Sequence, residues 1–287
     1  MSIGTRSDNK AVAFFLAPSL LGFLTFFLVP FVIAALYSFV DNPISNNFVG
    51  LDNYIQLLGN RAYASACINT LVFTAISVPL NMALSLAIAL LLNKNIYIRS
   101  ILRIAFILPL IAPTASVVLI WQVVFDFHGS LNSVLSFAGV QPIDWMNSQW
   151  TRLVVVAFYL WKNIGYNMIL FLAALQNIPG EYYEAATIDG AGPVGRFINI
   201  TSVFLAPTTF FVLIISIINS FKVFREIYLI SANYPHESIY MLQHYMNNMF
   251  MSLDYQKLST AAVMMAFVIV VIVFVLFRVE KKISQDI

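Results

Sequence analysis

The sequence has few charged residues. Only 10% of its 287 residues are Asp, Glu, Lys or Arg, whereas an average soluble domain carries about 25%. So few charges cannot cover the water-facing surface of a soluble protein of this length. With 60% hydrophobic residues and a mean hydropathy of +0.84, the composition is that of an integral membrane protein. The net charge is only +2, and the scattered basic residues give no nucleic-acid-binding surface.

Cysteine and histidine are also scarce. Cys67 is the single cysteine, which excludes an internal disulfide and a cysteine-rich metal site. His128, His236 and His244 all fall in the predicted outer loops and form no H-E-x-x-H pattern. We interpret them as solvated loop residues. The sequence therefore predicts no metal site, no cofactor and no catalytic residue.

Long apolar runs are abundant. A helix that crosses the bilayer needs about 20 predominantly apolar residues, and six runs meet this length. The first run is retained in the protein, because a signal-peptide core is only about 7–15 residues long. Pro109 and Pro113 are predicted to bend the third helix. The chain is therefore predicted to be an all-α polytopic membrane protein with one transmembrane domain, residues 1–287, whose spans are residues 11–40, 67–92, 104–125, 152–176, 203–230 and 258–277.

The basic residues between the spans predict the orientation, because Lys and Arg are enriched in cytoplasmic loops. One set of helix ends carries nine of them and the opposite set carries three. This bias places both termini in the cytoplasm, the 126–150 loop outside and the 177–201 loop inside. The nine are Arg6, Lys10, Lys94, Arg99, Arg103, Arg196, Arg278, Lys281 and Lys282; the three are Arg61, Arg152 and Lys257.

Charges inside the spans indicate a protein interior or a wet cavity, because they are costly in lipid. Lys162 lies about ten residues into the fourth span, near the middle of the membrane. It is either a snorkelling or paired structural lysine, or a residue beside a translocation path. Lys222 and Glu226 are four residues apart and could pair on one helix face; we interpret them as a structural pair.

The inner loop, residues 178–202, is punctuated for two short helices. Pro179 suits the first turn of a helix, Gly190 can take the left-handed conformation that ends it, and Pro193 can begin a second helix. This predicts an elbow along the inner face of the membrane, suited to a groove in another protein, or else a capped connector. Residues 190–195 match G-x-G-x-x-G, but no strand precedes them, so they do not predict a nucleotide site.

The elbow sequence resembles the EAA loop of binding-protein-dependent ABC permeases. Glu184-Ala185-Ala186 is followed by Gly190 and then Ile200. More narrowly, the whole chain is similar to the maltose-type carbohydrate permease family, specifically to its first permease subunit. Two positions depart from the family pattern: Ser202-Val203 stands where the family has Leu-Pro, and Asn233-Tyr234-Pro235 where it often has Gly-Gly-Pro. Further similar segments are residues 17–20, 48–54, 69–70 and 129–132.

This resemblance implies the type I ABC importer fold, with a cytoplasmic coupling helix, in the cytoplasmic membrane of a prokaryote. It implies a heterodimer with a second permease subunit, two ATPase subunits that hydrolyse the ATP, and an extracytoplasmic substrate-binding lipoprotein that delivers a sugar. The coupling residues implied by the motif are Glu184, Ala185, Ala186, Asp189 and Gly190.

The same resemblance implies a sugar site near the middle of the membrane. On each span the three positions share one helical face, and aromatic rings with amides and hydroxyls suit a sugar. The alternative for these residues is polar contact between helices. A permease for a peptide or an amino acid is the main rival function, and a secondary transporter is a further one. The substrate residues implied are Tyr159, Asn163 and Tyr166 with Ser216, Asn219 and Ser220.

Overall fold

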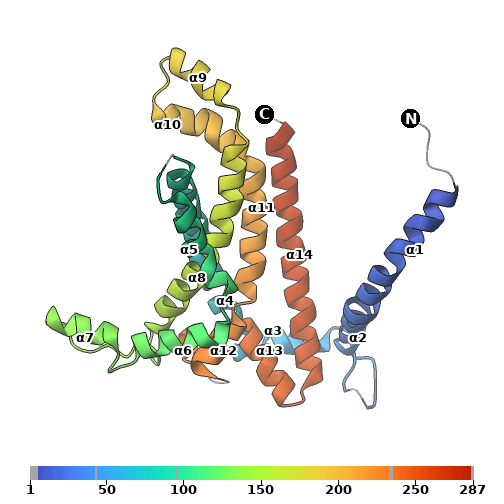
Figure 1. The fold of residues 1–287 in the computed structure, drawn as a ribbon. Coiled ribbons are helices and arrows are strands. Elements are labelled where there is room, and N and C mark those ends of the chain that lie inside the picture. The colour runs from blue at the N-terminus through green and yellow to red at the C-terminus, as the bar shows by residue number, and fades with distance from the viewer. Residues whose placement is uncertain (1–5, 43, 95, 233–234, 286–287) are drawn as a thin grey trace. The chain divides into compact units, whose positions relative to one another are not determined.

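The computed structural model describes residues 6–42, 44–94, 96–232 and 235–285. The regular elements within these residues are helices, and the β pairing found there is one isolated antiparallel bridge between Val40 and Phe48. Two units are distinguished: residues 1–60 with 246–268, and residues 61–245 with 269–287 (Figure 1). Asn233 and Tyr234, which depart from the family pattern, lie outside the described residues.

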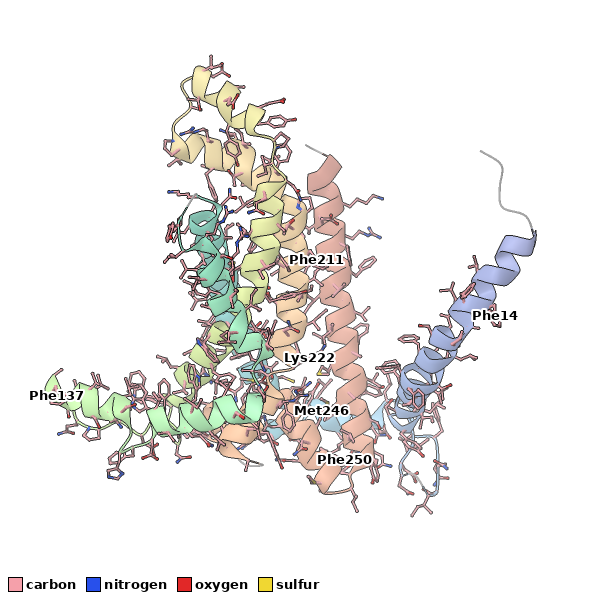
Figure 2. All side chains as sticks on the ribbon, in the orientation of Figure 1. Phe14, Phe137, Phe211, Lys222, Met246 and Phe250 are labelled. Carbon is pink, nitrogen blue, oxygen red and sulfur yellow. The ribbon has the colours of Figure 1, made fainter. Side chains whose placement is uncertain are left out.

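The first unit begins with a long apolar helix. Helix α1 (Arg6–Phe23) continues through a π-helical turn (Leu24–Leu28) into α2 (Val29–Tyr37). The π turn ends beside Pro30, which has no N–H to donate to the preceding turn. Helix α3 (Asp52–Leu58) follows, and the Asn53 amide donates to the carbonyls of Ser38 and Val40, both at 2.9 Å. Phe14 of α1, labelled in Figure 2, is 76% exposed.

The second unit is built on α4 (Arg61–Asn93), α8 (Thr151–Gln176) and α11 (Ser202–Phe221). Helix α4 buries one stripe at intervals of three and four residues, the spacing of a single helical face. Two apolar clusters fill the interior, one around Met168, Phe171 and Leu205 and the other around Phe73 and Tyr159. The stripe of α4 comprises Tyr63, Ala66, Thr70, Phe73, Ser77, Asn81, Ser85, Ala89 and Leu92.

The third apolar run is not one helix. It is divided at Ala112 and Pro113 into α5 (Arg99–Ile111) and α6 (Thr114–Phe125), with Ala112 in extended conformation. The prolines were predicted to bend one helix; instead the helix ends before Pro113, while Pro109 lies inside α5. Figure 1 shows α5 alongside α8, whereas α6 and the following α7 (Ser130–Phe137) run crosswise. The predicted third span, residues 104–125, thus covers two helices of different direction.

Helices α5 and α8 pack closely at Gly165. A Cβ built on Gly165 would lie 1.8 Å from the Phe106 carbonyl oxygen and 2.5 Å from its carbonyl carbon. Such a separation is tolerable only without a side chain, because small residues let the backbones of membrane helices approach one another. Gly165 therefore sets how closely α5 lies against α8.

Six helical stretches in the described residues are long and apolar enough to cross a membrane, which confirms the predicted fold class. Their limits differ from the predicted spans mainly in the third, where the apolar stretch includes α6 and α7. The fifth stretch ends with α12 (Phe224–Ser231), and the sixth lies in α14 (Tyr255–Gln285). Between them are a 3-10 turn (Glu237–Ile239) and α13 (Leu242–Met251). The stretches are Phe14–Tyr37, Arg61–Asn93, Thr114–Phe137, Thr151–Gln176, Pro193–Ser231 and Tyr255–Lys282.

Candidate functional site

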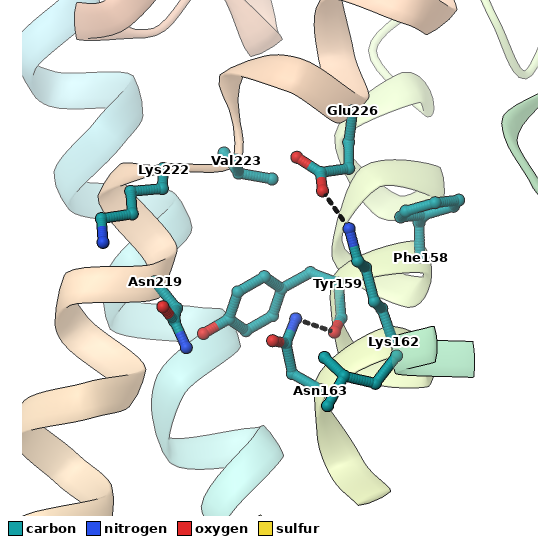
Figure 3. A pocket seen from close by; sticks show the side chains of 9 residues that line it. Phe158, Tyr159, Lys162, Asn163, Asn219, Lys222, Val223 and Glu226 are labelled. Atoms are coloured by element: carbon teal, nitrogen blue, oxygen red, sulfur yellow. Dashed lines mark hydrogen bonds and ion pairs between the residues drawn. The ribbon is translucent and has the colours of Figure 1, made fainter. Parts of the chain in front are cut away.

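A polar cavity of about 210 Å³ lies in the second unit, between α8, the end of α11 and the start of α12. Six of the nine lining residues are polar or charged, and charged residues are unusual in the interior of a membrane protein. Figure 3 shows side chains from α8 and from the α11–α12 segment facing one another across it. The lining residues are Leu110, Phe158, Tyr159, Lys162, Asn163, Asn219, Lys222, Val223 and Glu226.

Three of the six residues implied as substrate contacts line this cavity: Tyr159, Asn163 and Asn219. The Tyr159 hydroxyl donates to the Ser216 carbonyl at 3.0 Å, and the Asn163 amide donates to the Tyr159 carbonyl at 2.8 Å. Tyr159 is almost wholly buried, so its ring position is fixed by packing against Phe73. The cavity therefore presents one rigid phenol and two amides from two different helices.

The other three implied residues lie elsewhere. Ser216 and Ser220 are buried: the Ser216 hydroxyl accepts from the Asn167 amide at 2.9 Å, and the Ser220 hydroxyl bonds that of Thr74 at 2.8 Å. Both therefore join α11 to neighbouring helices. Tyr166 is 37% exposed and does not line the cavity.

The intramembrane charges pair differently from the sequence prediction. The Lys162 ammonium contacts the Glu226 carboxylate at 2.5 Å and donates to the Thr114 hydroxyl at 3.0 Å. The predicted pairing of Lys222 with Glu226 is wrong, because α11 ends at Phe221 and α12 begins at Phe224. This break removes the continuous helix on which residues four apart share a face. Lys162 is therefore a paired lysine, as the first interpretation has it, and it also lines the cavity. Its position beside a translocation path stays a prediction.

A buried polar cluster beside the cavity was not predicted. The Asn167 amide donates to the Asn81 side-chain oxygen at 2.5 Å as well as to Ser216. The Ser85 hydroxyl donates to the Ile164 carbonyl at 3.1 Å. These bonds join α4, α8 and α11 at the centre of the bundle. Asn81 and Asn167 are polar residues within apolar runs, which was the signal available in the sequence.

Arg152 holds the segment after α12 against the bundle. Its guanidinium donates to the Ser238 carbonyl, at 2.8 and 3.0 Å, and to the Asn69 side-chain oxygen at 2.9 Å. Asn69 in turn donates to the carbonyls of Glu237 and Tyr240, at 2.7 and 3.0 Å. In the sequence, Arg152 served only to predict the orientation of the spans, as one of the three basic residues on the outer side. Its hydrogen bonds to Ser238 and Asn69 were not predicted.

His244 corrects a second expectation. It is fully buried in α13, with its ring 4.7 Å from that of Phe224, so it is not a solvated loop residue. Burial away from water lowers the pKa of His244 to about 4. Of the other two histidines, His128 is exposed, and the ring of His236 bonds the Ser238 hydroxyl at 2.9 Å.

The predicted elbow is present in the 178–202 loop. Helix α9 (Gly180–Ile188) follows Pro179, and Gly190 ends it with φ +78°. The Gly190 and Ala191 amides close the turn on the carbonyls of Thr187 and Ala186, at 3.1 and 2.8 Å. Pro193 opens α10 (Pro193–Arg196), which a π-helical turn (Phe197–Thr201) joins to α11 (Figure 1). The two short helices predicted from Pro179, Gly190 and Pro193 are thus confirmed.

Two side-chain contacts join α9 to the N-terminal end of α11 and to the π-helical turn before it. The Tyr183 hydroxyl bonds that of Thr201 at 2.9 Å, and the ring of Tyr182 lies 5.0 Å from that of Phe204. Arg196 donates to the Thr187 hydroxyl at 3.0 Å. The elbow is therefore held as one body with α11.

The outer surface of the elbow is open. No residue of α9 is buried, and Ile188 is 87% exposed. Glu184, Ala185, Asp189 and Gly190 are all exposed, while Ala186 is half-buried. A shallow hollow beside Glu184 is lined by Tyr183, Thr187, Ile188 and Arg196. The exposed face of α9 thus combines an apolar side chain, a carboxylate and small side chains.

The described residues thus combine six helical stretches suited to crossing a membrane, a polar cavity among the helices and an exposed elbow, an architecture that suits a membrane transport subunit. The particular family is shown by comparison: residues 81–287 match the binding-protein-dependent transport system inner membrane component family. This chain belongs to that family and is a multi-pass membrane protein.

Curated relatives extend the similarity beyond the matched segment. The chain is 38% identical over 232 residues to the arabinooligosaccharides transport system permease protein AraP of Bacillus subtilis, covering 79% of this chain and 74% of the relative. It is 32% identical over 279 residues to the sn-glycerol-3-phosphate transport system permease protein UgpA of Pectobacterium atrosepticum, covering 94% of each. It is 35% identical over 190 residues to the trehalose/maltose transport system permease protein MalF of Thermococcus litoralis, covering 66% of this chain and 64% of the relative.

The fold is also similar to a solved structure. A chain in the crystal structure of a bacterial ABC transporter involved in the import of the acidic polysaccharide alginate superposes with a TM-score of 0.85. The alignment covers 97% of both chains at 22% identity, a similarity that shows the fold alone.

Proposed function

We propose that this chain is a permease subunit of an ATP-driven, binding-protein-dependent importer of a sugar or sugar derivative. The observation that carries the proposal is the polar cavity held between α8 and α11, the two helices that the elbow connects. Family membership supplies the transport class. The names of the relatives support a carbohydrate cargo, since they transport arabinooligosaccharides and trehalose or maltose.

The cavity serves as the cargo site in this proposal. Sugars are bound by hydrogen bonds to their hydroxyls and by contact with aromatic rings, and Tyr159, Asn163 and Asn219 offer both. Ser216 and Ser220 support the site indirectly by fixing α11 against α8 and α4. Tyr166 stays in the proposal as an exposed ring on the same face of α8, where a second subunit could complete the site.

The elbow serves as the coupling surface. ATP hydrolysis takes place on separate ATPase subunits, and the elbow seats in their surface through Glu184, Ala185, Ala186, Asp189 and Gly190. The carboxylate of Glu184 is exposed and available for charge-assisted hydrogen bonds, and the alanines allow close packing. Gly190 keeps the turn tight in a conformation that other residues rarely adopt.

The remaining partners follow from the family. The chain pairs with a second permease subunit in the cytoplasmic membrane of a prokaryote, with both termini in the cytoplasm and the elbow on the same side. An extracytoplasmic binding protein delivers the cargo. The similar alginate transporter has been solved in complex with an alginate pentasaccharide-bound periplasmic protein, which supports this arrangement.

Substituting Glu184 tests the coupling role. Glu184→Lys reverses the charge on the exposed face of α9 and is expected to abolish uptake of radiolabelled oligosaccharide in cells while the subunit stays in the membrane. Glu280→Lys, which makes the same charge change on α14, is the matched control and is expected to retain uptake. Normal uptake with Glu184→Lys, or loss of uptake with both variants, would contradict the assignment.

A further inference from the structure

We infer that the cargo carries a negative charge, a carboxylate or a phosphate, and that Lys222 binds it. This inference rests on the proposed function and specifies the substrate class of the same cavity. It depends on the balance of charges around the cavity, on the position of Lys222 and on the neutral groups beside it.

The charges that line the cavity do not cancel. Lys162 and Glu226 neutralise one another at 2.5 Å, and Thr114 takes a further hydrogen bond from the same ammonium. Lys222 is the third charged residue of the lining. Among the residues that the structure describes, no carboxylate lies within ion-pair distance of the Lys222 ammonium. The lining therefore carries one uncompensated positive charge.

The position of Lys222 makes this charge available to a ligand. The residue follows the last residue of α11, at the break before α12, and its side chain is exposed, whereas those of Lys162 and Glu226 are 17% and 12% exposed. Figure 2 labels Lys222 at this end of α11, and Figure 3 shows Lys222 apart from the Lys162–Glu226 pair. The partial negative charge at the end of the helix offsets only about half of the ammonium charge.

The neutral lining groups suit the rest of such a cargo. Asn219 lies one turn before Lys222, and the Tyr159 ring points toward Asn219 from α8, with Asn163 beside it (Figure 3). Amides bind sugar hydroxyls as donor and acceptor, and a lysine ammonium binds carboxylate or phosphate oxygens.

The test compares cargoes that differ in charge. The chain is co-purified with its partner permease, ATPases and binding protein and reconstituted in proteoliposomes. Uptake is measured for digalacturonate, for its methyl ester, for glycerol 3-phosphate and for neutral maltotriose and arabinotriose. We expect digalacturonate or glycerol 3-phosphate, but not the methyl ester, to be a preferred cargo, and the one taken up distinguishes the carboxylate from the phosphate.

Three variants then assign the preference to one residue. Lys222→Gln is expected to raise KM for the anionic cargo about 10- to 100-fold, the effect of losing one hydrogen bond to a charged group. Lys222→Arg keeps the charge and is expected to retain the preference. Arg225→Gln is the matched control, because Arg225 is a neighbouring exposed cation that does not line the cavity.

The outcomes separate the two proposals. Uptake of neutral sugars with no anionic cargo overturns the inference and leaves the proposed function standing. An equal effect of Lys222→Gln on charged and neutral cargoes also overturns it, since the variant would then act on the structure alone. A reconstituted transporter that moves none of the five probes contradicts the proposed function as well.

Discussion

Breaking the Lys162–Glu226 ion pair on one side is expected to destabilise the protein strongly. Both side chains are largely buried, with 17% and 12% of their surface exposed, and their charged atoms lie 2.5 Å apart. Removing one partner of a buried pair leaves an uncompensated charge and costs about 3–5 kcal/mol, whereas replacing both by apolar residues is often neutral. Lys162→Met and Glu226→Leu should each be destabilising, and the double variant should recover most of the loss.

The measurement is a double-mutant cycle on the detergent-solubilised transporter, followed by the apparent Tm and by the amount of monodisperse protein. Each single variant is expected to lower the apparent Tm by about 10 °C, a shift on the order of that expected from the free-energy cost. The coupling free energy between positions 162 and 226 should be several kcal/mol, because the wild type and the double variant are each more stable than either single variant. Additive effects of the two single changes would refute the reasoning, because they would mean that the two groups do not depend on one another.

Three further predictions concern single positions. Gly165→Ala should cost about 3 kcal/mol and reduce the yield of folded protein in size-exclusion chromatography, because its Cβ would lie 1.8 Å from the Phe106 carbonyl oxygen; normal yield would contradict the close packing. The buried His244 has a pKa of about 4, against 6.5 when exposed, so its contribution of about 3 kcal/mol is complete above pH 6.5 and lost as the pH falls toward 4. The apparent Tm of the wild type should accordingly fall over this range more than that of His244→Met, and parallel curves would contradict it. Gly190→Ala, strained at φ +78°, should lower uptake per ATP hydrolysed, while Gly192→Ala, whose φ is −70°, should not; equal effects of the two would contradict the role of the turn.

Much of the fold could be predicted from composition because the membrane restricts the possibilities. Apolar runs of about 20 residues have few alternatives to helices. The elbow was also predictable, because Pro179, Gly190 and Pro193 act through local backbone preferences that need no knowledge of distant contacts. A bend near Pro113 followed from the same local rule, whereas the division of the third run into two helices and the crosswise direction of α6 did not.

The charged part of the site could not be predicted from spacing. The predicted pairing of Lys222 with Glu226 assumed a continuous helix. The helix ends at Phe221, and Glu226 pairs with Lys162 instead. That partner is 64 residues away in the sequence. The burial of His244 likewise depends on Phe224 and Tyr240, whose approach is set by tertiary packing. Three of the six implied substrate residues, Tyr159, Asn163 and Asn219, line the cavity. The binding of substrate by any of the six stays a prediction.

The elbow and the cavity are both formed on helices α8 and α11. From Lys162 to the end of α8 at Gln176 is 14 residues, or about 21 Å of helix. Between these points the Asn167 side chain bonds both α4 and α11. These bonds oppose sliding of α8 along its neighbours, so a displacement of the elbow is transmitted along α8 to the cavity. A tilt of roughly 10° about the far end of such an arm displaces its tip by about 4 Å, given the helical rise. In the proposed transporter, a movement of that size at the elbow would change the width of the cavity between α8 and α11.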